Sequence, residues 1–177
     1  MAVTTLSKTL GVLNEMQREG VIGKYAIGGA IAAFYYLEAA ATFDVDIFIS
    51  LEPSAGERSS LAPIYEYLRA RGYEEKGETV AIEDWDVQFI PAYNPLVKEA
   101  LSAATATDLD GIATRILPAE FLMAIALQTG RSKDLARLVQ FLEAGVADRA
   151  RFSEILQRHG LEGKWRTFQV KFRPTGS

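Results

Sequence analysis

The stretch Phe43-Asp44-Val45-Asp46-Ile47-Phe48-Ile49 decides the fold prediction, because two acidic residues alternate in it with apolar ones. Its β-branched and aromatic residues favour a strand, which we expect over residues 42–50. Side chains alternate between the two faces of a strand, so Asp44 and Asp46 share one face. Two neighbouring carboxylates repel each other and are costly to bury, which suggests a cation between them. An edge strand with one wet face is the other interpretation.

A glycine pair lies upstream, with fourteen residues between it and Asp44. Gly28-Gly29 follows a predicted short strand over residues 24–27 and precedes a predicted helix over residues 30–37. Glycine lets the backbone approach a ligand closely, and a helix start offers free N–H groups to an anion. A strand-to-helix turn also needs glycine for packing, so a phosphate contact and a packing role both stay open.

A third carboxylate, Asp86, lies alone in the apolar stretch 85–90. We expect this stretch to form a strand that pairs with residues 78–82 through a turn at Glu83-Asp84. If it also lies beside strand 42–49, Asp86 joins Asp44 and Asp46 on one surface. Three such carboxylates can hold two Mg²⁺ ions, which clamp a nucleoside triphosphate and activate a hydroxyl. The alternative is an Asp86 beside the hairpin, with Asp84 competing for the role.

The composition limits the kinds of site that this chain can build. It has 177 residues, no cysteine and one histidine, so disulfides, thiolate metal sites, His-rich zinc sites and Ser-His-Asp triads lack parts. Oxygen ligands remain, and these favour Mg²⁺ or Mn²⁺. We expect His159 to be a surface residue or a helix C-cap. Since no signal peptide or membrane span is visible, we expect a cytoplasmic protein with no membrane partner.

Charge is unevenly divided along the chain. Residues 1–114 hold 8 Lys/Arg and 17 Asp/Glu, whereas residues 115–177 hold 11 and 6. This division suggests a metal-bearing region that faces an anion-bearing one, or simply two solvated halves that attract each other.

The helical pattern changes after Pro118. We expect an α/β core over residues 1–117 and a C-terminal helical portion over residues 118–177, packed on the core. The predicted C-terminal helices cover residues 119–129, 132–144 and 148–159, with Ser132 and Asp148 as N-caps.

The order of these features resembles a known family. Gly28-Gly29, then Thr42-x-Asp44-x-Asp46, then Asp86 is similar to the nucleotidyltransferase fold of the DNA polymerase beta superfamily. The chain is most similar in pattern to small bacterial nucleotidyltransferases of the abortive-infection toxin type. Gly130-Arg131-Ser132-Lys133-Asp134 resembles the Arg-x-Lys-Asp segment of their helical part, and the resemblance covers about residues 22–145.

This resemblance implies an α/β (α+β) fold, in which a mixed sheet is flanked by helices, and a metal-dependent transfer reaction. The enzyme would move a nucleoside monophosphate from an NTP such as ATP to a hydroxyl of RNA, protein or a small molecule, with Mg²⁺ or Mn²⁺ as cofactor. By analogy the acceptor is a tRNA end or a protein, and an antitoxin-like partner is implied. By this resemblance, Gly28 and Gly29 would lie beside the triphosphate, and Asp44, Asp46 and Asp86 would bind the metal ions. Arg131 and Lys133 would either neutralise phosphate charge or hold the helical part against the site. Asp134 would orient one of these two cations.

Two positions depart from the family's usual pattern. Gly-Gly stands where many active members have Gly-Ser, and residues 124–128 lack the lysine that relatives often carry one turn before Gly130. These departures favour a second hypothesis, a catalytically inactive nucleotide- or protein-binding module on the same fold. A third hypothesis is a toxin–antitoxin component that acts by complex formation, and it is compatible with either of the others.

Overall fold

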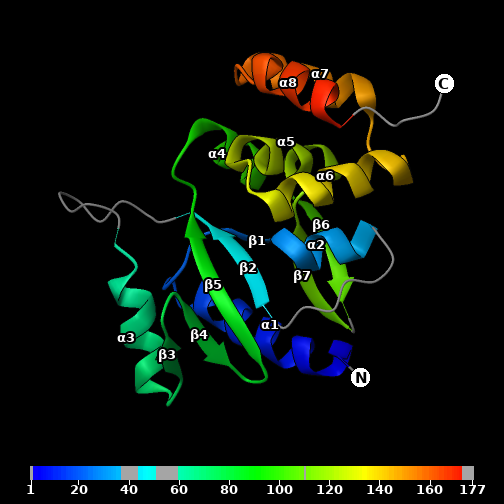
Figure 1. The fold of residues 1–177 in the computed structure, drawn as a ribbon. Helices are drawn as coiled ribbons and strands as arrows, with labels where there is room; N and C mark the ends of the chain where they lie inside the picture. The colour runs from blue at the N-terminus through cyan, green and yellow to red at the C-terminus, as the bar shows by residue number, and fades with distance from the viewer. Residues whose placement is uncertain (1, 37–43, 51–59, 110, 173–177) are drawn as a thin grey trace.

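A seven-stranded mixed sheet forms the centre of the protein (Figure 1). The computed structural model describes residues 2–36, 44–50, 60–109 and 111–172. In order across the sheet the strands are β3 (Glu74–Lys76), β4 (Thr79–Ile82), β5 (Trp85–Pro91), β2 (Asp44–Ile49), β1 (Tyr25–Gly28), β7 (Ile112–Ile116) and β6 (Thr105–Leu109). Thr42 and Phe43, which begin the strand predicted over residues 42–50, lie outside the described residues.

The strand pairing brings the two acidic strands together. β2 pairs with β5 in parallel, and β5 pairs antiparallel with β4, so both pairings expected from the sequence are confirmed. β1 runs antiparallel to β2 and parallel to β7, and β2 is the central strand of the seven. Two antiparallel hairpins, β3–β4 and β6–β7, complete the edges.

The two faces of the sheet differ in what covers them. Val45, Ile47 and Ile49 are fully buried on one face, the face on which α1 (Ala2–Arg18) packs. The Tyr25 hydroxyl, also on this face, donates to Asn14 of α1 at 2.6 Å. The opposite face carries Asp44, Asp46 and Phe48, because side chains alternate along β2. The opposite face is also partly core, because Phe48 and its register partner Ala26 are buried there, and it carries the acidic residues Asp44 and Asp46 beside them.

Seven further helices follow α1 among the described residues, and the last of them, α8, was not expected from the sequence. They are α2 (Gly29–Tyr36), α3 (Ala62–Ala70), α4 (Pro95–Ser102), α5 (Ala119–Thr129), α6 (Ser132–Ala144), α7 (Arg149–Arg158) and α8 (Glu162–Lys171). In Figure 1, α4, α5 and α6 lie above the sheet, and α7 and α8 form a further layer beyond them. The predicted α/β fold class, a mixed sheet with flanking helices, is confirmed.

The structure corrects one predicted cap and confirms another. Ser132 was expected to cap α6, but Arg131 is the N-cap and Ser132 is the first helical residue. Asp148 caps α7 as expected, since its Oδ1 accepts from the backbone N–H of Arg151 at 3.0 Å. His159 is the C-cap of α7, as one of the two expectations had it, and its ring contacts Glu99.

Buried polar contacts join the last helices to the rest of the chain. Glu120 of α5 is only 7% exposed, and its Oε1 accepts from the Asp148 backbone N–H at 2.8 Å. Glu99 of α4 contacts both Arg158 and His159 at the end of α7. These contacts fix α7 to α5 and α4. Whether residues 1–117 and 118–177 are separate domains stays a prediction.

Helix length and composition also bear on membrane insertion. Across the described ranges, every helix is too short or too polar to cross a bilayer.

Candidate functional site

The sheet register places three acidic residues on one face. The Cα atoms of Asp44 and Asp86 are direct partners across the parallel β2–β5 pair, and Asp46 follows two residues along β2. Neighbouring strands lie about 4.8 Å apart and residues rise about 3.3 Å along each strand. The three Cα atoms therefore fall within roughly 8 Å of one another. Asp84 lies in the turn between β4 and β5, outside both strands.

The glycine pair meets β2 at the same place, because Gly28 is the register partner of Asp46. A Cβ on Gly28 would lie 2.2 Å from a ring carbon of Phe48. A Cβ on Gly29 would lie 1.8 Å from Oδ2 of Asp46, and Gly29 has a φ of +58°. Packing against Phe48 therefore explains Gly28. Gly29 lets the first turn of α2 approach the Asp46 carboxylate, and that turn carries the free N–H groups of a helix start.

The Asp46 carboxylate lies in an unusual electrostatic setting. Burial raises its pKa, and Asp44 raises it further, while the positive charges of Arg137, Lys133 and Arg131 act in the opposite direction. Burial is the largest of these effects. The nearby positive charges therefore do not fully offset the cost of burying the ionised Asp46 carboxylate. A bound cation would stabilise this ionised form.

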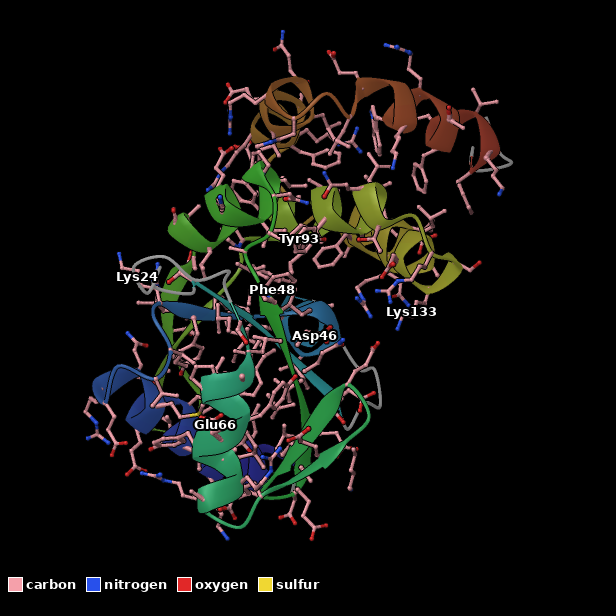
Figure 2. All side chains as sticks on the ribbon, turned by 90° about the vertical axis from the view of Figure 1, so that its left-hand side faces the viewer. Lys24, Asp46, Phe48, Glu66, Tyr93 and Lys133 are labelled. Carbon is pink, nitrogen blue, oxygen red and sulfur yellow. The ribbon has the colours of Figure 1, made fainter. Side chains whose placement is uncertain are left out.

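The opposing positive charges all come from the start of α6. Arg131 and Lys133 were expected either near the phosphates or as anchors of the helical part, whereas Arg137 was not expected to have a role. The sequence could have indicated Arg137, because residues 133 and 137 are four apart and therefore share one face of a helix. Figure 2 shows Lys133 and Asp46 where α6 meets the sheet.

The three cations of α6 are not equivalent. The Arg131 guanidinium donates to buried Asp134, with Nε 2.6 Å from Oδ2 and Nη2 3.3 Å from Oδ1. Asp134 therefore holds Arg131 in place. Lys133 and Arg137 make no hydrogen bond or ion pair within the described part of the chain, so their charges remain available to an anion.

Asp86 has a cationic neighbour of its own. Its Oδ1 lies 3.5 Å from Nζ of Lys76 on β3, in a pair whose side chains are 35% and 62% exposed. The described residues contain no group of three or more His, Cys, Asp or Glu side chains gathered closely enough to hold a metal. The backbone thus brings Asp44, Asp46 and Asp86 to one face, while the side chain of Asp86 is paired with Lys76.

The residues nevertheless fit a divalent cation. Carboxylates on adjacent strands are the donors that Mg²⁺ and Mn²⁺ prefer. Asp46 is a half-buried carboxylate whose pKa is raised by burial, and a bound cation would stabilise its ionised form. The Lys76–Asp86 pair is solvent-exposed, and such pairs contribute about 0.2–1 kcal/mol, so Asp86 is released from it at little cost.

Comparison with known proteins bears on the fold. No protein-family model matches the chain, and no curated protein matches it by sequence. The crystal structure of an antigenic nucleotidyltransferase-like protein from Paracoccidioides brasiliensis matches with a TM-score of 0.68 and 15% identity, over 96% of this chain and 89% of that one. The solution structure of the antibiotic-resistance factor ANT(2'')-Ia matches with a TM-score of 0.57 and 16% identity, over 96% of each chain. The chain therefore has the fold of nucleotidyltransferase-like proteins.

Proposed function

We propose that this protein is a metal-dependent nucleotidyltransferase, which transfers a nucleoside monophosphate from an NTP to a hydroxyl acceptor. The observation that carries the proposal is the register of β1, β2 and β5, in which Asp44, Asp46 and Asp86 share one face beside the start of α2. The nucleotidyltransferase-like fold supports it.

In this proposal Asp44, Asp46 and Asp86 hold Mg²⁺ or Mn²⁺. When bound, the metal supplies charge stabilisation for the phosphates and lowers the pKa of the attacking hydroxyl. Carboxylates carried on adjacent rigid strands would give the precise placement that such chemistry needs.

The chain's own residues bind and orient the triphosphate. The backbone N–H groups at the start of α2, exposed by Gly29, face the phosphates, and Lys133 and Arg137 neutralise charge from the α6 side. Arg131 stays paired with Asp134 and positions this end of α6. These cations counter the repulsion that the acidic face would otherwise exert on the substrate.

The reaction is a substitution at the α-phosphorus. The acceptor oxygen forms a bond to this phosphorus, the bond to the α–β bridging oxygen breaks, and pyrophosphate leaves with that electron pair. Asp86 is the proposed base that takes the hydroxyl proton. The proposed acceptor is a hydroxyl of RNA, such as a tRNA end, of a protein or of a small molecule.

Label transfer tests the proposal. The protein is incubated with α-labelled NTPs, Mg²⁺ or Mn²⁺ and a cell extract that is fractionated into RNA, protein and small molecules. We expect Asp44→Asn and Asp46→Asn to reduce transfer by on the order of 100-fold or more. Asp84→Asn, in the neighbouring turn, is the matched control and should transfer like the wild type. Transfer that persists in both strand variants would refute the mechanism.

One observation favours a second candidate function, a nucleotide-binding module without turnover. Asp86 is paired with Lys76, and the described acids do not form a three-residue metal cluster. Calorimetry separates the two functions, because binding of ATP without label transfer from any NTP supports the inactive module. A protein that co-purifies with the chain would support a toxin–antitoxin role, whether the chain is an active transferase or an inactive binding module.

A further inference from the structure

Tyr93 differs from the other exposed aromatic residues. It is 65% exposed, and it makes no hydrogen bond or ring contact with another residue in the part of the chain that the structure describes. Tyr35, which is 51% exposed, packs edge-on against Tyr36, and Phe172 stacks on Phe168. An aromatic face that is open to solvent and unoccupied by a neighbouring ring is available to a planar ligand.

The backbone beside Tyr93 is firmly held. Asn94 caps α4, since its Oδ1 accepts from the Val97 backbone N–H at 2.8 Å. Its Nδ2 donates to Oε1 of Gln128 at 2.8 Å, and Lys164 of α8 donates to the Gln128 carbonyl at 2.8 Å. Asn94 is therefore held by α4 and α5, so the backbone position of Tyr93 relative to α5 is set by the fold.

Tyr93 also lies within electrostatic range of Arg131, at the start of α6. The pKa of Arg131 is raised chiefly by its hydrogen bond to Asp134, and Asp46 and Tyr93 both add to this effect. Pro91, two residues before Tyr93, is the register partner of Ile49, which is three residues along β2 from Asp46. Along β2, Ile49 and Asp46 are about 10 Å apart. Figure 2 shows Tyr93, Phe48 and Asp46 in succession from α5 down to the sheet.

We propose that Tyr93 is the stacking surface for the nucleobase of the bound NTP. This inference rests on the proposed function, which places the triphosphate between Gly29 and the start of α6. A nucleoside that extends from there along β2 and β5 brings its base to the open face of Tyr93. Stacking is tolerant of base identity because every base has a π-face, so Tyr93 binds purine and pyrimidine nucleotides alike.

Comparing ATP with inorganic tripolyphosphate tests this inference. Both carry the phosphates, but only ATP carries a base, and calorimetry in Mn²⁺ measures each without requiring turnover. We expect Tyr93→Ala to weaken ATP binding roughly 5- to 150-fold and to leave tripolyphosphate binding unchanged. Tyr93→Phe should keep ATP affinity within about twofold, because it retains the ring. Tyr35→Ala is the matched control and should change neither affinity.

The outcomes separate this inference from the proposed function. If Tyr93→Ala leaves ATP affinity unchanged, or weakens both probes equally, Tyr93 does not stack on the base, although the proposed function stands. If the wild type binds neither probe, the proposed function fails and the inference fails with it. If Tyr93→Phe loses as much ATP affinity as Tyr93→Ala, the hydroxyl and not the ring is the contact, which also overturns the inference.

Discussion

Replacing Gly29 by alanine tests the geometry on which the site depends. Gly29 has a φ of +58°, where an alanine is disfavoured by about 1–2 kcal/mol. The added Cβ would also lie 1.8 Å from Oδ2 and 2.9 Å from Cβ of Asp46. Rotating the carboxylate away removes the first overlap but not the second, so β2 or α2 must move. Overpacking of this kind costs about 1–3 kcal/mol.

Gly20→Ala provides the matched control. Gly20 has a φ of +75°, and a Cβ added there would have no atom within 4 Å beyond its immediate chain neighbours. We therefore expect Gly20→Ala to lower the free energy of unfolding by about 1–2 kcal/mol and Gly29→Ala to lower it by about 2–5 kcal/mol. The difference isolates the contact with Asp46 from the backbone effect that both variants share.

Urea unfolding, followed by circular dichroism, measures both variants, and calorimetry measures Mn²⁺ binding. Gly29→Ala should also weaken Mn²⁺ binding, because it displaces a proposed ligand, whereas Gly20→Ala should not. Equal destabilisation by the two variants, with equal Mn²⁺ affinity, would show that the start of α2 is not pressed against Asp46.

Three further outcomes are expected. Lys76→Gln should strengthen Mn²⁺ binding about two- to fivefold by calorimetry, because it frees Asp86 from an exposed ion pair, and weaker binding would contradict this. The pKa of Glu99 is lowered, first by its hydrogen bond from Arg158, so its stabilising effect is present above the ordinary pKa of a glutamate and is lost as pH falls through the lowered value. Urea unfolding should therefore show Glu99→Gln less stable than the wild type at pH 7 and equal to it at about pH 2; a constant difference would count against the ion pair. Arg137→Met should weaken tripolyphosphate binding roughly tenfold, and by less at high salt; no change would remove this residue from the anion site.

The strands and most helices could be predicted because their local patterns were strong. The alternation in residues 44–49 determined both the strand and the face of its acids, and the helix over residues 132–144 has the predicted bounds. β3 was missed because Glu74–Lys76 consists of three exposed charged residues with no apolar alternation. α8 was missed because Phe168 is its one buried residue, which leaves no helical periodicity to detect.

The site was predictable in its acids but not in its surroundings. Asp44, Asp46 and Asp86 could be predicted because they are charged residues in apolar strands. Arg131 and Lys133 were predicted only through the family resemblance. Their roles stay predictions. The pairing of Asp86 with Lys76 depends on a hairpin edge that the sequence does not mark, and the approach of Arg137 depends on how α6 docks. Such contacts arise from tertiary packing, which no local pattern encodes.

The antiparallel direction of β1 relative to β2 has a thermodynamic consequence. It brings the end of β1 and the start of β2 to the same end of the strand pair, so the start of α2, the proposed anion site, adjoins Asp46, a proposed metal ligand. Each ligand then screens the charge that opposes the other. Linkage requires that the factor by which Mn²⁺ strengthens tripolyphosphate binding equals the factor by which tripolyphosphate strengthens Mn²⁺ binding. The protein should therefore take up metal and triphosphate as a cooperative pair, with each alone held weakly.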